Sequence, residues 1–373
     1  MISNLKRILI FALIFSMLVC ALSACATTEG TTETQAIEET SGETADTTPE
    51  ASNEKILDIY FIAGQSNAVG STKITDSAAL YNWYPDLVMG VSNVLYAGNS
   101  RSSGSGTRDR VISWQETKQG FGRSDSCIGP EAGMAKALSA YYNDQTGNYA
   151  GIIKYAYGGS SLLNETSGNT HKDGNWVSPS YQATLSPNEI VDGVTGQMYR
   201  NFLAQVETNI REVLEGKSTM GKYDFDGVRI CGLYWMQGCT DRNNPKKYET
   251  AFQYFAQDVR NDLSEMMKSF SGTDDDFGAS EMPIMVGTIS ETYSLTLSST
   301  INTNRSFIAM QKALPEKIEN CYVVDNSSYE ITKWENGSMK VLGSDEWHWN
   351  QADMLAIGKN VGDLMLQVAI IKE

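Results

Sequence analysis

A serine, an aspartate and a histidine stand at positions where together they could carry out acyl transfer. Ser66 follows an apolar run directly, and Asp345 and His348 lie three residues apart near the C-terminus. A serine hydroxyl becomes an effective nucleophile only when a base takes its proton, and that base must be held in the correct tautomer. One turn of chain can bring the Asp345 carboxylate to Nδ1–H of His348, which leaves Nε2 for Ser66.

The same reaction needs hydrogen-bond donors for the negative charge that develops on the carbonyl oxygen. Gly158 and Gly159 end a second apolar run, where missing side chains let backbone N–H groups approach a ligand. Gln237 ends a third run and offers a side-chain amide. Each feature also has a structural explanation, because a serine after a strand is often a helix N-cap and an Asp-x-x-His pair often caps a loop. The occurrence of all these features in one chain favours a catalytic role over the structural explanations.

These residues need a scaffold that gathers strand ends at one edge. Residues 56–63 form an almost continuous run of β-branched and aromatic side chains, typical of a strand buried on both faces of a parallel sheet. Further strands are predicted at 150–157, 228–235, 283–289 and 322–324, with another possible at 91–97. Helices are predicted at 130–138, 197–214, 248–270 and 351–368. The stretch from 71 to 129, rich in Gly, Ser and Asn, is interpreted as long active-site loops.

This alternation predicts a three-layer α/β/α sandwich with a mostly parallel sheet of about five strands. In such folds ligands bind beyond the carboxyl ends of the strands, where Ser66 lies.

Four motifs occur in an order that resembles the SGNH-type esterases, specifically the branch of sialate O-acetylesterases and acetyl xylan esterases. They are Gly64-Gln65-Ser66-Asn67, Gly158-Gly159, the segment Trp235-Met236-Gln237-Gly238-Cys239-Thr240-Asp241, and Asp345-Glu346-Trp347-His348. Gly129-Pro130-Glu131 also resembles a block of that family. The resemblance extends from residue 56 to the C-terminus, and it implies a flavodoxin-like SGNH fold and catalysis without a metal or other cofactor.

The resemblance also implies a role for each matching residue. Ser66 would be the nucleophile, Asp345 and His348 the charge pair, and Gly159 and Gln237 oxyanion donors beside the N–H of Ser66. The residues predicted to bind substrate are Gln65, Asn67, Gly158, Glu131 and Trp347.

One position departs from the family pattern. Cys239 stands where the family usually has a glutamate. That glutamate is expected to support the catalytic residues without reacting itself, so its loss leaves the triad in place and puts the rate and the substrate detail in doubt.

Other templates fit less well. Ala68 stands where a G-x-S-x-G elbow has its second glycine. Gly216-Lys217-Ser218 is not a phosphate loop, because Arg211 occupies the position of the first glycine.

Several tryptophans could form a platform for sugar rings, although most tryptophans simply pack. Trp347 and Trp349 flank His348, and Trp114 and Trp176 fall in predicted loops.

The 373 residues, 41% of them apolar, suffice for one large domain. The net charge of −16 argues against a nucleic-acid partner, which requires a basic surface, and no obligate protein partner is evident. With no CxxC and only two histidines, His171 and His348, we expect no metal site. The domain cysteines could form disulfides or stay as buried thiols, and the sequence leaves both open; they are Cys127, Cys231, Cys239 and Cys321.

The N-terminal residues predict export and attachment to a membrane. Lys6 and Arg7 precede an apolar run that is too short to span a bilayer and ends at Leu22. Leu22-Ser23-Ala24-Cys25 resembles the bacterial lipobox, whose cysteine is lipidated after cleavage; an uncleaved N-terminal anchor is the alternative. We therefore predict a signal peptide at 1–24, an acidic Thr- and Ser-rich linker at 25–54 and an esterase domain at 55–373.

Together these features predict a lipid-anchored extracytoplasmic serine esterase that removes O-acetyl groups from a carbohydrate. An acetylated polysaccharide such as xylan and acetylated sialic acid both remain open as substrates. The alternatives are a surface glycan-binding lipoprotein with a decayed esterase site and an O-acetyltransferase that uses the same acyl-enzyme. In each case the only membrane contact is through the N-terminal lipid.

Overall fold

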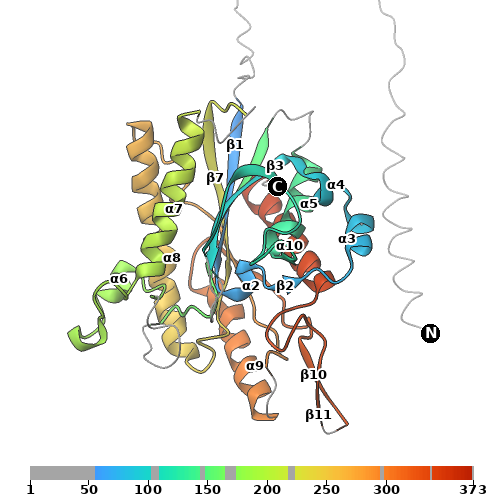
Figure 1. The fold of residues 1–373 in the computed structure, drawn as a ribbon. Helices are drawn as coiled ribbons and strands as arrows, with labels where there is room; N and C mark the ends of the chain where they lie inside the picture. The colour runs from blue at the N-terminus through green and yellow to red at the C-terminus, as the bar shows by residue number, and fades with distance from the viewer. Residues whose placement is uncertain are drawn as a thin grey trace, which may run out of the picture. The chain divides into compact units, whose positions relative to one another are not determined.

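The computed structural model describes residues 55–101, 109–142, 148–163, 174–216, 223–294, 298–336 and 338–371. Its centre is a seven-stranded sheet in the order β4-β3-β6-β1-β7-β8-β9 (Figure 1). The strands are β1 (Ile56–Gly64), β3 (Val91–Arg101), β4 (Asp109–Thr117), β6 (Tyr149–Tyr157), β7 (Gly227–Met236), β8 (Ile284–Gly287) and β9 (Cys321–Val324). Neighbouring strands are parallel except β3 and β4.

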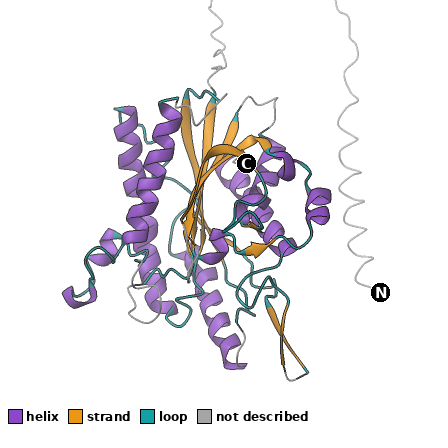
Figure 2. Ribbon diagram, viewed as in Figure 1, coloured by secondary structure: helices purple, strands orange, loops and turns teal. Residues whose placement is uncertain are grey.

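Helices cover both faces of this sheet (Figure 2). One face packs against α7 (Gln197–Leu214), α8 (Pro245–Ser271) and α9 (Ser298–Ala313). The other packs against α5 (Pro130–Tyr141) and α10 (Gln351–Met365), which a π-helical turn extends to Ile371. The predicted three-layer α/β/α sandwich is confirmed.

Side chains of β1 alternate between the two cores, as expected for a central strand. Phe61 packs on the α7 side, and Tyr60 and Ile62 pack on the α10 side, all with no exposed surface. Because both faces are covered, the strand reads as one continuous apolar run.

The five predicted strands are consecutive in the sheet, in the order β6-β1-β7-β8-β9, and β9 forms one edge. The chain moves from β1 to one side and later returns to the other, which creates the switch point where ligands bind in open α/β sheets. The strand expected at 91–97 is β3, and β4 lies outside it at the edge of the sheet.

Two large elements were not predicted. The stretch interpreted as active-site loops contains β4, whose exposed edge position leaves it with few buried apolar side chains, Trp114 among them. Helix α9 begins with the polar run Ser298–Asn304, in which Ile301 is the one apolar residue, so its helical period is weak.

Smaller elements connect this framework. They are α2 (Ser66–Val69), α3 (Ser77–Trp83), α4 (Asp86–Met89), α6 (Pro179–Gln182), the pair β2 (Thr72–Lys73) and β5 (Cys127–Ile128), and the hairpin β10 (Thr332–Glu335) and β11 (Ser338–Val341).

The helices α5 and α10 touch backbone to backbone. A Cβ placed on Gly358 of α10 would lie 2.2 Å from the Pro130 carbonyl oxygen, and one on Gly133 of α5 would lie 2.2 Å from the Leu355 carbonyl oxygen. Although Gln351–Ile371 is long and apolar enough to cross a membrane, Met354 and the side chains that follow it on the same face lie in the core, as in a soluble core helix.

Candidate active site

The strands β1, β6 and β7 end at the same level. Gly64 pairs with Ala156 of β6 on one side and with Met236 of β7 on the other. The segments that follow these residues therefore emerge together, which brings Ser66, Gly159 and Gln237 to one edge of the sheet.

Ser66 is the first residue of α2 and is partly exposed, whereas its neighbours Gln65 and Asn67 are buried. The turn before it depends on Gly64, whose φ of 141° and close approach to the Met236 carbonyl leave no space for a side chain. The backbone N–H of Gln65 donates to that same carbonyl at 3.0 Å. The end of β1 is thus held against β7, and this places Ser66 just beyond the carboxyl end of the strand.

Gln65 faces the protein and not the solvent. Its Oε1 accepts hydrogen bonds from the backbone N–H groups of Gly238 (3.1 Å) and Thr240 (3.4 Å). It was predicted to bind substrate, but these contacts make it a link between the Ser66 turn and the loop after β7.

The aspartate and the histidine are in direct contact. The two carboxylate oxygens of Asp345 lie 2.7 and 2.8 Å from Nδ1 of His348. Oδ1 also accepts from the backbone N–H groups of Trp347 and His348 at 2.9 and 3.0 Å. Burial raises the pKa of Asp345, but these hydrogen bonds outweigh it and the pKa lies below its ordinary value. The carboxylate is therefore ionised and orients the ring.

The other ring nitrogen of His348 is buried and, within the described part of the chain, has no hydrogen-bond partner. No hydrogen bond there joins it to Ser66. Hydrogen bonds between catalytic groups are often long or absent until substrate binds.

The loop that carries His348 lies beside the loop that carries Ser66. Asn67 Nδ2 is 3.4 Å from the carbonyl oxygen of Trp347, and the Thr72 hydroxyl donates to the carbonyl of Trp349 at 3.0 Å. The fold thus brings the predicted nucleophile and base to the same place from opposite ends of the domain.

Two backbone donors remain available at this edge. The N–H of Gly158 is used, because it donates to the Arg101 carbonyl at 2.7 Å. The N–H groups of Ser66 and Gly159 have no acceptor among the residues that the structure describes. Gly159, with φ of 70°, adopts the left-handed conformation that favours glycine.

Gln237 has both amide hydrogens engaged. Its Nε2 donates to the Ser160 carbonyl at 3.1 Å and to Asp241 Oδ2. Asp241 also accepts from the Ser161 hydroxyl and from the N–H of Leu162, so it clamps the loop after β6 to the loop after β7. The role of Gln237 as an oxyanion donor stays a prediction, and these contacts indicate that it positions the Gly159 loop.

Glu131, predicted to contact substrate, has no exposed surface. It forms a buried ion pair with Lys154 at 2.9 Å, and its Oε1 accepts from the Gly129 N–H at 2.9 Å. Lys154 also donates to the carbonyls of Val69 in α2 (3.1 Å) and Phe121 (3.0 Å). Glu131 therefore acts on the site through Lys154, which holds the C-terminus of the helix that begins at Ser66.

Cys239 supplies no charge at the position where the resemblance had led us to expect a glutamate. Burial raises the pKa of its thiol to about 12, so the thiol is neutral. Its carbonyl accepts a 2.6 Å hydrogen bond from Arg242, whose guanidinium lies 5.1 Å from the centre of the Tyr293 ring. All four domain cysteines are free and buried, which settles the alternative of disulfide bonds.

Of the tryptophans considered as a sugar platform, three are packing residues. Trp114, Trp176 and Trp349 are buried, whereas Trp347 is 44% exposed and lies next to His348. His171 and Cys25 lie outside the described residues. Among the residues described, no group of three or more His, Cys, Asp and Glu side chains is arranged to hold a metal ion.

The sequence matches the model of a protein family described as carbohydrate esterase, sialic acid-specific acetylesterase, over residues 56–367. A search of curated proteins gave no significant match. Similar solved structures include NanS, with a TM-score of 0.49, 14% identity and coverage of 84% of this chain and 98% of that one.

A protein of Arabidopsis thaliana is similar with a TM-score of 0.44 and 16% identity, covering 84% and 98% of the two chains. A carbohydrate acetylesterase from Xanthomonas citri has a TM-score of 0.44 and 12% identity, covering 85% of this chain and 57% of that one. The family match spans nearly all of the folded domain and includes Ser66, Gln237, Asp345 and His348. The chain therefore belongs to the carbohydrate esterase family of sialic acid-specific acetylesterases, which are carboxylic ester hydrolases.

Proposed function

We propose that the protein removes O-acetyl groups from a carbohydrate through an acetyl-enzyme on Ser66. The observation that carries this proposal is the Asp345–His348 pair, with Nδ1 bound to an ionised carboxylate and Nε2 unpartnered, in a loop that contacts the residue after Ser66. A base held in this tautomer can accept the serine proton.

The reaction then proceeds in two steps, acetylation of Ser66 and hydrolysis of the acetyl-enzyme. Ser66 Oγ attacks the acetyl carbonyl as its proton passes to His348 Nε2, and the oxyanion faces the N–H groups of Ser66 and Gly159. The C–O bond to the sugar breaks, and His348 returns the proton to the departing sugar oxygen. A water molecule, deprotonated by His348, attacks the acetyl-enzyme, and acetate leaves as Ser66 regains its proton.

The substrate is an acetylated polysaccharide such as xylan, or an acetylated sialic acid. Support comes from the family, whose members deacetylate carbohydrates. Acetate release from acetylated xylan, acetylated pectin and O-acetylated sialic acids, measured side by side, tests the proposal. No release from any acetylated carbohydrate would contradict it.

The domain works on the extracytoplasmic face of a bacterial membrane, held by lipid on Cys25. Support comes from the apolar segment and the Leu-Ser-Ala-Cys motif that follows it.

A glycan-binding protein with a decayed esterase site is the second candidate, favoured by the neutral Cys239 at the glutamate position. Hydrolysis of p-nitrophenyl acetate separates the two. A decayed site would release no p-nitrophenol above the background of the Ser66→Ala variant.

A further inference from the structure

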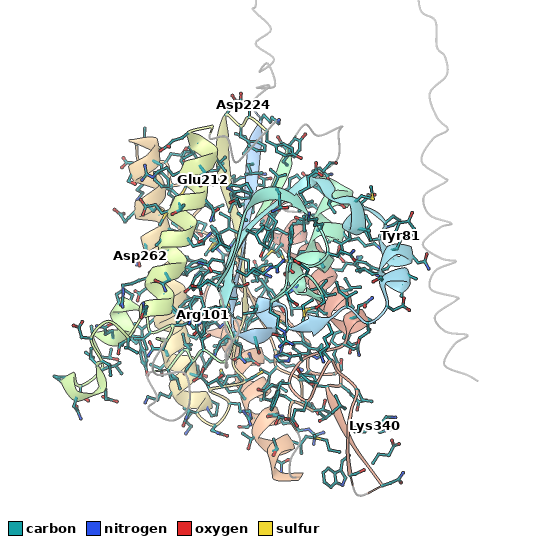
Figure 3. All side chains as sticks on the ribbon, in the orientation of Figure 1. Tyr81, Arg101, Glu212, Asp224, Asp262 and Lys340 are labelled. Carbon is teal, nitrogen blue, oxygen red and sulfur yellow. The ribbon has the colours of Figure 1, made fainter. Side chains whose placement is uncertain are left out.

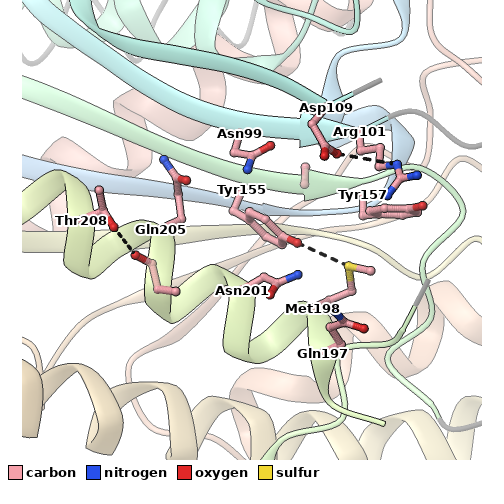
Figure 4. A pocket seen from close by; sticks show the side chains of 12 residues that line it. Asn99, Arg101, Asp109, Tyr155, Tyr157, Gln197, Met198, Asn201, Gln205 and Thr208 are labelled. Atoms are coloured by element: carbon pink, nitrogen blue, oxygen red, sulfur yellow. Dashed lines mark hydrogen bonds and ion pairs between the residues drawn. The ribbon is translucent and has the colours of Figure 1, made fainter. Parts of the chain in front are cut away.

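A cleft of about 530 Å³ opens between α7 and the strands β3 and β6 (Figure 4). This volume falls within the ~300–1,000 Å³ typical of small-molecule sites. It does not contain Ser66, His348 or Gln237, so it is separate from the site described above.

The cleft exists because the sheet is wider than its helical cover. The apolar stripe of α7, which includes Phe202 and Val206, packs on the central strands, while β3 and β4 extend beyond it. The Trp114 indole N–H of β4 donates to the Asn209 carbonyl of α7 at 3.1 Å, which ties the helix to the edge strand. The space between is left to polar side chains.

Several amide side chains line the cleft without a hydrogen bond to the described part of the protein. Asn99 of β3 and Gln197 and Gln205 of α7 line the cleft, and their side chains have no hydrogen-bond partner among the described residues. Asn201 also lines the cleft, where the Tyr155 hydroxyl donates to the Met198 sulfur at 3.5 Å. Figure 4 shows Asn99 on the sheet side of the cleft and Gln197, Asn201 and Gln205 spaced along the helix side. Each free amide offers two donors and one acceptor group, which matches the hydroxyl groups of a sugar.

The charges in the cleft balance. Arg101 and Asp109 are its charged lining residues, and they lie 3.6 Å apart. The Arg101 guanidinium also lies 5.5 Å from the centre of the Tyr157 ring. With its cation already beside a carboxylate, the cleft favours an uncharged polyhydroxylated ligand over an anionic one.

The cleft extends to the carboxyl ends of the strands, which is the end of the sheet where Ser66 lies. Arg101 pairs with Tyr157, and Tyr157 directly precedes Gly158-Gly159. In Figure 3, Arg101 marks this edge and Asp224, just before β7, marks the opposite one. β3 is separated from β1 by β6 alone, so their ends lie about 10 Å apart at ~4.8 Å per strand. That separation suits neighbouring units of one glycan chain.

We propose that this cleft binds an unacetylated, neutral sugar unit of the same glycan whose acetyl group is presented to Ser66. This inference rests on the proposed function, because only an esterase would have the glycan as its substrate. Binding of a sugar in the cleft can nevertheless be tested with ligands that carry no ester. It predicts that the protein prefers oligomeric substrates to acetylated monosaccharides.

The test is calorimetric titration of the wild-type protein with unacetylated xylotetraose, cellotetraose, mannotetraose and tetragalacturonate. At least one neutral tetramer should bind, and Gln205→Ala and Gln197→Ala should each weaken that binding about three- to tenfold, as the loss of a hydrogen bond implies. Gln257→Ala is the matched control, because it removes the same side chain from the exposed face of α8. Thermal melting of each variant checks its fold.

Three outcomes would overturn the proposal. They are no binding of any neutral tetramer, binding that both cleft variants leave unchanged, and tighter binding of tetragalacturonate than of every neutral tetramer. Because these ligands carry no ester, binding in a protein that releases no acetate would refute the proposed esterase activity while the cleft assignment stood.

Discussion

The chemistry of this site depends on which hydrogen bonds are made and which are left open. Asp345 holds one nitrogen of His348 and leaves the other unpartnered, and Gly158 uses its N–H while Gly159 does not. Hydrogen-bonding groups that the described part of the protein leaves without a partner at this site are the ones that a substrate can engage.

Ser66→Ala should fold normally and lose nearly all esterase activity. The remaining groups can supply only oxyanion stabilisation and binding, so the residual rate should be a small fraction of the wild-type rate. Acetate release and circular dichroism on the same sample measure both effects. Activity within about tenfold of the wild type would refute Ser66 as the nucleophile.

His348→Ala should abolish turnover, and wild-type activity should fall at low pH. Only a neutral imidazole accepts the Ser66 proton, so activity rises with pH and is lost as His348 takes up a proton. The lowered pKa of Asp345 keeps the carboxylate ionised while this happens, so the acid limb reports the imidazole. A pH series of kcat/KM measures this limb.

The other histidine is the control for that experiment. His171→Ala should retain the same acid limb, with at most a change in KM. A dead His171→Ala beside an active His348→Ala would show that the assignment of the C-terminal motif is wrong.

Gln237→Ala separates direct from indirect stabilisation of the oxyanion. Loss of a direct donor typically costs about 10²–10³ in kcat. Because both amide hydrogens already have acceptors, we expect a smaller loss in kcat, together with a lower Tm from the broken link between two loops. A loss of the full size at an unchanged Tm would instead show that Gln237 contacts the oxyanion directly.

At the scale of elements, the buried Lys154–Glu131 ion pair connects α2, which begins at Ser66, to β6 and α5. Lys154 on β6 bonds at once to α5, through Glu131, and to the last residue of α2, through the Val69 carbonyl. Burial lowers the pKa of Lys154 and the nearby Glu131 carboxylate opposes this, so each member depends on the other. The pair therefore couples the position of Ser66 to the packing of α5.

Lys154→Met should lower the free energy of unfolding by about 3–5 kcal/mol, because it leaves the Glu131 carboxylate buried without a partner. Chemical denaturation measures this change. The double variant Lys154→Met/Glu131→Leu should recover much of the stability, since no unpaired charge remains. Its kcat should stay low, because α2 has still lost the donor to Val69. Recovery of kcat together with stability would limit the pair to a role in folding.

At the scale of the whole molecule, the chain combines an acidic N-terminal stretch with a domain whose site faces one edge of the sheet. Residues 26–54 lie outside the described part of the chain, and their composition, acidic with no Lys or Arg, predicts a solvated tether. Such a tether would let a lipid-anchored domain reach an insoluble or surface-bound glycan.

Cys25→Ala should move the protein from the membrane fraction to the soluble fraction, or leave an unprocessed signal. The kcat of the purified domain should not change, because the lipid takes no part in catalysis. Metabolic labelling with palmitate, compared between the variant and the wild type, is the measurement. Label that persists in the variant would place the attachment elsewhere.

The sequence by itself determined the five consecutive parallel strands from β6 to β9 and the helices α5, α7, α8 and α10, but not α9. β1, β6 and β7 are buried on both faces and so read as continuous apolar runs, and α7 was predicted with the bounds 197–214 that the structure has. The contact between Asp345 and His348 could be expected from their spacing because it is local, within one turn of chain, whereas their catalytic role stays a prediction.

Only the tertiary structure decided what each polar side chain faces. Glu131 and Gln65 read as site residues, yet one is sealed against Lys154 and the other holds the loop after β7. The cleft beside α7 likewise depends on β4, an edge strand with too little burial to leave a pattern. Strand type follows from local side-chain chemistry, but burial and hydrogen-bond partners follow from contacts between residues far apart in the chain, which local composition does not encode.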